Sequence, residues 1–183
     1  MIRIEGWASV EEPDCVGDVL IASGAAWHLT NGGPRAPKLF YAHDDHNQTP
    51  VGRVLSLEQR KHPSGKAGLW ITAVVLDTAV GKDLQELMRH QRLSFSLGFF
   101  IVDADLVSTA TTDLVHLTKT AIFECSIVSN PCVRNATIEV VEDITAADLD
   151  KLTASKSAPK PIGRSTTAAI EALRQFNKDQ ANV

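Results

Sequence analysis

The stretch QRLSFSLGFF, residues 91–100, marks the change of pattern from which the fold can be worked out. Before it, apolar residues recur at three- and four-residue spacing over residues 77–92, which predicts a capped amphipathic helix. Within it, apolar and small residues alternate, which predicts a strand. Ser94 and Ser96 therefore lie on a strand that directly follows a helix. This order differs from the strand, turn and helix that present the serine of α/β-hydrolases.

Similar short alternating stretches recur along the first part of the chain, and turn-rich pieces such as NGGP and HPSG separate them. This pattern is typical of a β-rich α+β fold, and we assign it to a main domain over residues 1–142. The predicted strands cover residues 2–10, 18–21, 38–42, 52–57, 68–76, 94–102, 115–119 and 121–129.

The composition changes after about Glu142. Residues 143–163 are predicted to hold a short helix and then a flexible linker rich in Ser, Ala, Pro and Lys. Residues 164–183 are predicted to form a last amphipathic helix with a thin apolar stripe. Such a stripe either packs back on the domain, or docks on a partner or a second copy of the chain in a homo-oligomer.

Composition limits the classes of function. With 183 residues and 44% hydrophobic content, the chain can bury one ordinary core. The net charge of -4 with interspersed signs gives no basic patch, so no nucleic-acid partner is expected. The sequence has no signal segment and no uncharged apolar run near 18 residues, so no membrane partner is expected.

The three cysteines, Cys15, Cys125 and Cys132, suggest neither a disulfide framework nor a metal knuckle by their spacing. We expect all three to be small core residues in a reducing cytoplasm.

The strand that begins at Ser94 has two distinct faces, because side chains alternate between the sides of a strand. One face is apolar and is expected to be the core side; it holds Phe95, Leu97, Phe99 and Ile101. The other face holds Ser94, Ser96, Gly98 and Phe100. Two interpretations remain open here: small polar residues on the outer face of a half-buried strand, or a nucleophile.

A serine nucleophile needs an adjacent base, usually histidine. His43 is the best candidate, because it stands where the apolar strand 38–42 ends in a polar cluster. A turn of solvated polar residues is an equal alternative. A metal site built on residues 43–46, which read HDDH, is a third, although adjacent residues on an extended chain diverge. The remaining histidines, which we expect to be solvated or structural, include His28, His62, His90 and His116.

Glu124 lies in the apolar stretch 121–131, where Phe123, Cys125 and Ile127 are expected to form the core face. A carboxylate in so apolar a strand needs a partner. An imidazole N–H would be suitable, because the carboxylate would fix the tautomer of the ring. A salt bridge is the alternative, with a cation drawn from Arg53, Lys119 or Arg134.

Several blocks in order over residues 4–138 resemble the prohead proteases of tailed bacteriophages of the HK97 type, a branch of the herpesvirus-assemblin-like serine proteases. The blocks that carry the resemblance are GWAS at 6–9, Asp14 with GDV at 17–19, AHD at 42–44 with VG at 51–52, FSLGF at 95–99, and ECSIV at 124–128 with NPC at 130–132 and NA at 135–136.

The resemblance implies a small, mainly antiparallel β-barrel flanked by helices, like the herpesvirus proteases. It places the family's serine nucleophile on Ser96, its histidine on His43 and its acidic third member on Glu124. Ser94 is the alternative register for the nucleophile. The resemblance also gives Gly98 a role, which is to leave room beside the nucleophile for a substrate backbone.

The function implied by this resemblance is cleavage of peptide bonds during capsid maturation. The implied substrates are the scaffolding segment of the major capsid protein and the protease itself, inside the assembling prohead in the host bacterial cytoplasm. No metal or organic cofactor is implied. Two alternatives stay open: an inactive scaffold or binding module of the same fold, and a metal-dependent hydrolase that uses His43 to His46.

Overall fold

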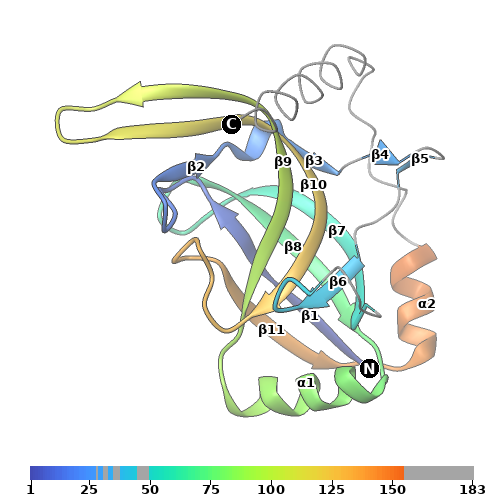
Figure 1. The fold of residues 1–183 in the computed structure, drawn as a ribbon. Coiled ribbons are helices and arrows are strands. Elements are labelled where there is room, and N and C mark those ends of the chain that lie inside the picture. The colour runs from blue at the N-terminus through green and yellow to red at the C-terminus, as the bar shows by residue number, and fades with distance from the viewer. Residues whose placement is uncertain (28, 31–32, 35–37, 45–49, 155–183) are drawn as a thin grey trace, which may run out of the picture.

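Most of the strands described by the structure form one large mixed sheet (Figure 1). The computed structural model describes residues 1–27, 29–30, 33–34, 38–44 and 50–154. The strands are β1 (Ile2–Val10), β2 (Asp18–Leu20), β3 (Ala25–Trp27), β6 (Lys38–Tyr41), β7 (Gly52–Lys61), β8 (Ala67–Val75), β9 (Ser94–Ser108), β10 (Asp113–Val128) and β11 (Thr137–Asp143), with β4 (Leu29–Thr30) and β5 (Gly33–Pro34) in a separate pair. The helical elements are the 3-10 turn η1 (Ala22–Gly24), α1 (Ala79–His90) and α2 (Ala146–Ala154).

The large sheet is open, so the predicted closed barrel is wrong. Its order is β11-β1-β8-β7-β6-β10-β2, with β3 and β9 also paired to β10. Closure would require the ends of the sheet to pair with one another. Among the described residues, β11 pairs with β1 and β2 pairs with β10, while β1 and β9 lie in contact without forming a ladder. The β-rich α+β class itself is confirmed.

Strand β10 organises this sheet because it is paired along both edges. It runs antiparallel to β9 on one side. On the other side it runs parallel to β2, β3 and β6 in turn. The two strands predicted over 115–119 and 121–129 are therefore parts of one strand, whereas β11 was not predicted from the sequence at all.

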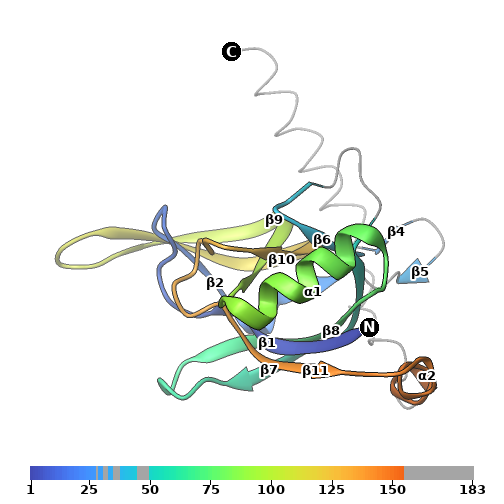
Figure 2. The ribbon, with the colours of Figure 1, turned by 90° about the horizontal axis from the view of Figure 1, so that it is seen from below.

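The helix that precedes β9 begins as its sequence predicts and ends at His90, slightly before the predicted end at about residue 92. Thr78 caps α1, since its Oγ1 accepts a hydrogen bond from the Gly81 N–H at 3.1 Å. Leu84 and Met88 are buried on the side of the helix that packs on the core. Figure 2 shows α1 crossing one end of the curved sheet. This packing fixes the point at which β9, with Ser96, starts.

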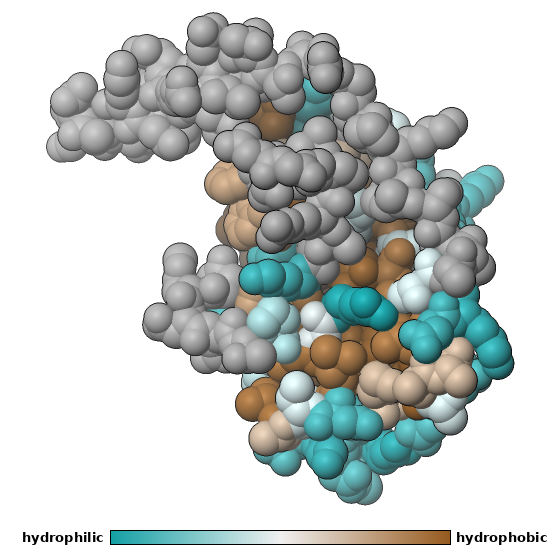
Figure 3. All heavy atoms as spheres, turned by 90° about the vertical axis from the view of Figure 1, so that its right-hand side faces the viewer, coloured by the Kyte–Doolittle hydropathy of each residue, from teal (hydrophilic) through white to brown (hydrophobic). Residues whose placement is uncertain are grey.

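The core lies inside the curved sheet and contains mainly aliphatic side chains from β1, β8, β9 and β10. Phe95 and Ile127 are fully buried there, opposite each other in the β9–β10 ladder. On the face that Figure 3 draws, apolar side chains gather near the centre and polar side chains surround them. The described residues include no helix that is long and apolar enough to cross a membrane.

The expected face pattern fails at Ile101 and Phe123, which are 47% and 37% exposed instead of buried. Register shifts interrupt the β9–β10 ladder, one of them between Ile122 and Glu124. Phe123 is the extra residue of this bulge, since Ile122 and Glu124 pair with the adjacent residues Phe99 and Gly98. Phe123 consequently packs against Phe100 on the outside, with ring centroids 4.7 Å apart. Beyond this point the two strands project as a long hairpin (Figure 1).

The prediction that all cysteines are reduced core residues is wrong for two of them. Cys15 and Cys132 form a disulfide between the segments that follow β1 and β10, with Cα atoms 5.0 Å apart. The backbone N–H of Cys15 also donates to the carbonyl of Cys132 at 3.0 Å. A sequence separation of 117 residues conceals this proximity. Cys125 is a free, buried cysteine as predicted.

The end of the described chain agrees with the predicted short helix, which is α2. The predicted linker from Ser155 onward and the last helix lie outside the described residues. The division into 1–142, 143–163 and 164–183 therefore stays a prediction.

Candidate active site

His43 lies in a tight turn directly after β6. Ala42 and His43 both have positive φ angles, 55° and 58°, a conformation that is uncommon for residues other than glycine. Strand β10 holds this turn by accepting two hydrogen bonds from backbone N–H groups of the turn. The Ala42 N–H donates to the Ile127 carbonyl at 3.0 Å, and the His43 N–H donates to the Ser126 Oγ at 3.2 Å. The imidazole is thereby held above the β9–β10 ladder.

The three side chains named from the sequence meet in one hydrogen-bonded row. The Nε2 atom of His43 lies 2.8 Å from the Oγ of Ser96, on β9. The Nδ1 atom of His43 lies 2.6 Å from the Oε1 of Glu124, on β10. The imidazole thus bridges a hydroxyl and a carboxylate, one through each ring nitrogen. This arrangement allows a proton to pass between Ser96 and His43 while Glu124 holds the ring.

Glu124 is only 3% exposed, and both of its carboxylate oxygens are hydrogen-bonded. The hydroxyl of the fully buried Ser126 donates to the second oxygen, Oε2, at 2.8 Å. Ser126 also accepts the His43 backbone N–H, so one side chain orients both members of the pair. We did not single out Ser126 from the sequence, although its position two residues after Glu124 puts it on the same face.

Gly98 has a role other than the one expected from the sequence. Gly98 lies opposite Glu124 in the β9–β10 ladder. A Cβ atom at Gly98 would lie 2.6 Å from the Oε1 and 2.7 Å from the Cγ of Glu124. Glu124, and not a substrate backbone, therefore occupies the space that this glycine leaves.

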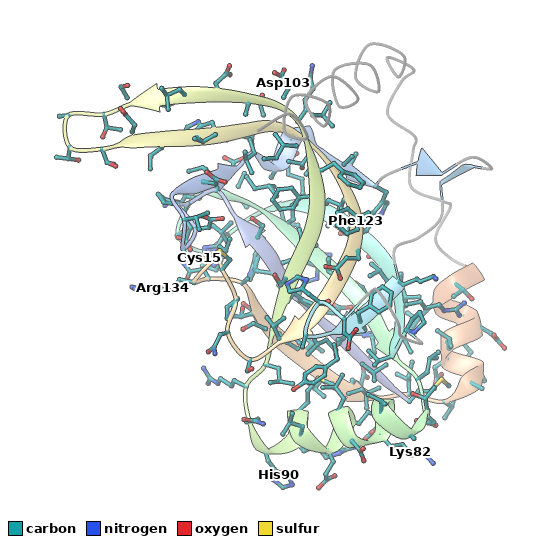
Figure 4. The ribbon with its side chains drawn as sticks, in the orientation of Figure 1. Cys15, Lys82, His90, Asp103, Phe123 and Arg134 are labelled. Atoms are coloured by element: carbon teal, nitrogen blue, oxygen red, sulfur yellow. A yellow bond between two sulfur atoms is a disulfide. The ribbon has the colours of Figure 1, made fainter. Side chains whose placement is uncertain are left out.

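The site is accessible from solvent, since the His43 side chain is 45% exposed. Ser94 lies opposite Val128 in the ladder, and the hydroxyl that contacts the imidazole belongs to Ser96. Of the cations considered for Glu124, Lys119 pairs with Asp103 at 3.7 Å instead. Arg134 projects outward from the fold (Figure 4).

The other histidines lie elsewhere. His62 packs its ring against Trp7 with centroids 4.9 Å apart, and His90 lies 2.9 Å from the Glu86 carboxylate on α1. His116 is on the β9–β10 hairpin, and His28 lies outside the described residues.

The metal alternative was based on the four residues 43–46. Within the described part of the chain, no group of three or more His, Cys, Asp or Glu side chains is arranged to hold a metal ion. Asp45 and His46 lie outside that part, so two of the four candidate ligands have no described position.

A serine hydroxyl, an imidazole and a buried carboxylate in this order form the arrangement that serine hydrolases use. The model of the Caudovirus prohead serine protease family matches residues 26–150, and the chain belongs to this family. It is 24% identical over 180 residues to the "Prohead protease" of Escherichia phage T5, an alignment that covers 94% of this chain and 80% of the relative. No solved structure matches the chain. The protein is therefore a serine peptidase of a family that acts in capsid maturation.

Proposed function

We propose that this chain is an endopeptidase in which Ser96 is the nucleophile, His43 the general base and Glu124 the residue that orients His43. The observation that carries the proposal is the row of two short contacts, 2.8 Å from Ser96 Oγ to His43 Nε2 and 2.6 Å from His43 Nδ1 to Glu124 Oε1. Neither contact is explained by a solvated turn or a surface salt bridge, because Glu124 is buried.

In the proposed reaction, the Oγ of Ser96 attacks the scissile carbonyl while its proton moves to His43 Nε2. The imidazolium then gives that proton to the leaving amine, and the C–N bond breaks to leave an acyl-enzyme. Water, deprotonated by His43, then attacks the ester, the bond between the acyl carbon and Ser96 Oγ breaks, and the imidazolium returns its proton to Ser96 as the second product leaves. Glu124 accepts the Nδ1–H throughout, which keeps Nε2 facing Ser96 and stabilises the imidazolium.

We further propose that the substrates are the scaffolding segment of the major capsid protein and the protease itself, inside the assembling prohead in the host bacterial cytoplasm. Membership of the prohead protease family supports this choice. The tail from about Asp143 is the segment we expect to be removed by self-cleavage, because its Ser/Ala/Pro/Lys composition is that of an accessible linker.

Co-expression with the major capsid protein of the same phage tests the proposal. The wild-type chain should shorten the capsid protein, Ser96→Ala should not, and Ser94→Ala should cleave as wild type does. Cleavage that persists with a chelator but is lost in Ser96→Ala supports the serine mechanism. Cleavage by Ser96→Ala would contradict it. A correctly folded wild-type chain that leaves the capsid protein intact would favour the inactive scaffold module.

A further inference from the structure

A small cavity of about 50 Å³ lies beside Ser96, and Ser96 is one of the residues that line it. It is located where β1 and β9 lie in contact without pairing, so it is part of the open seam of the sheet. Much of its wall is apolar, with Leu97, Phe99 and Leu117 among the lining residues. The proposed reaction does not use this cavity.

Two acidic residues, Asp14 and Asp18, are also among those that line this cavity. The Oδ1 atom of Asp14 accepts the backbone N–H groups of Val16 and Asp18, each at 2.9 Å. No Lys, Arg or His within the described ranges forms an ion pair with either carboxylate. Burial, and then the charge of Asp14, raise the pKa of Asp18. The cavity therefore carries negative charge that nothing in this part of the chain neutralises.

A third polar group in the wall lacks a partner. Ser9, on β1, is only 3% exposed and lines the same cavity. Its buried Oγ has no hydrogen-bond partner among the residues that the structure describes. Buried hydroxyl groups are normally hydrogen-bonded, and leaving one unpaired is costly. A donor brought within reach of this oxygen would satisfy it.

We propose that the cavity receives a basic side chain, lysine or arginine, from a substrate residue next to the scissile bond. The inference rests on the proposed function, because it takes Ser96 as the reacting group. The apolar wall suits the methylene stem of such a side chain, which packs on apolar surface while its charged end seeks acceptors. Asp14, Asp18 and Ser9 supply those acceptors, and hydrogen bonds between ionised partners are the strong ones.

Cleavage of a complex peptide library, read by mass spectrometry, tests this without knowledge of the natural substrate. The library is incubated with the full chain as wild type, Asp18→Asn, Ser9→Ala, Asp113→Asn and Ser96→Ala. Asp18→Asn keeps the size of the side chain and removes its charge, and Ser9→Ala removes the hydroxyl acceptor. Asp113→Asn is the matched control, since Asp113 is exposed on the distant hairpin.

The wild-type chain should cleave with lysine or arginine enriched about tenfold at one position next to the scissile bond. Asp18→Asn should lose most of that enrichment and still cleave at neutral residues, Ser9→Ala should reduce it, and Asp113→Asn should retain it. Cleavage that depends on Ser96 but shows no basic preference would overturn the inference and leave the proposed function intact. The same preference in Asp18→Asn as in wild type would also overturn it. Absence of any Ser96-dependent cleavage would contradict the proposed function, and the inference with it.

Discussion

Gly98 and Glu124 face each other across the β9–β10 ladder, and the carboxylate of Glu124 occupies the space where a Cβ atom of residue 98 would lie. The Glu124 carboxylate can therefore take this position only because residue 98 is a glycine. Through its hydrogen bond to the Nδ1 of His43, the same contact sets the direction in which the imidazole faces Ser96.

The substitution Gly98→Ala should therefore reduce activity while the chain remains folded. The added methyl group would lie 2.6 Å from the Oε1 of Glu124, so the carboxylate must move away from His43. A displacement of about 1 Å of a catalytic group can cost about 100-fold in rate. Rates of capsid cleavage, with circular dichroism as a check of folding, measure this. Ser94→Ala on the same strand is the control, and wild-type rates in Gly98→Ala would show that Glu124 does not orient His43.

Ser126→Ala should weaken both activity and stability. The variant removes the donor to Glu124 Oε2 and the acceptor for the His43 backbone N–H. Loss of a buried hydrogen-bond partner costs about 1–3 kcal/mol, so we expect the free energy of unfolding to fall by that amount and the cleavage rate to fall about tenfold. Denaturant unfolding and steady-state kinetics measure the two effects.

Ser129→Ala is the matched control for Ser126→Ala, because Ser129 is exposed on the same segment. It should change neither quantity. An unchanged rate in Ser126→Ala would mean that the turn at His43 is held without this hydroxyl.

The three cysteines should differ in their reaction with iodoacetamide at pH 8. Burial, and then the nearby charge of Glu124, raise the pKa of the Cys125 thiol well above its ordinary value, so the native thiol stays protonated and shielded. The folded chain should take up no label, because Cys15 and Cys132 are joined as a disulfide. Unfolding without a reductant should expose Cys125 alone, and unfolding with a reductant should expose all three.

Intact mass spectrometry counts the labels under each condition. Rapid labelling of the folded, unreduced chain would contradict the described burial of Cys125 or the disulfide.

The stability of α2 should depend on pH through Asp148. Hydrogen bonds from the Thr145 hydroxyl and backbone N–H lower the pKa of this carboxyl in the folded state. A carboxyl with a lowered pKa stabilises the fold above its unfolded pKa, and this contribution is lost as the pH falls through the folded pKa. Asp148→Asn should therefore melt at a lower temperature than wild type at pH 6, and the difference should vanish near pH 2. A difference that persists at pH 2 would argue against this capping contact.

Much of the fold could be predicted because local patterns determine it. The helical spacing of apolar residues before Ser94, together with the cap residue Thr78, predicted α1. The alternation of apolar and polar residues predicted most of the strands. Periodicity could not predict the bulge near Phe123, because a bulge inserts a residue without changing composition, and this misplaced Phe123. Sequence spacing likewise could not pair Cys15 with Cys132, which only the folded sheet brings together.

The residues of the candidate site could be predicted only with the help of the family resemblance. Alternation put Ser94 and Ser96 on one face and could not choose between them, and the resemblance to prohead proteases favoured Ser96. Nothing in the sequence around His43 indicates its left-handed backbone, because the sheet imposes that conformation through Ser126 and Ile127. From the sequence, Ser126 is indistinguishable from any other small strand residue. Only the structure reveals its hydrogen bonds to the His43 backbone N–H and the Glu124 carboxylate.

Covalent labelling with diisopropyl fluorophosphate tests the central claim most directly, because the reagent phosphorylates a serine only when an adjacent base activates it. The full-length chain is treated, digested and mapped by mass spectrometry, in parallel with His43→Gln. We expect a single adduct on Ser96 that appears together with loss of capsid cleavage and is absent from His43→Gln. An adduct on Ser94, or loss of cleavage while Ser96 remains unmodified, would contradict the assignment of Ser96 as the nucleophile.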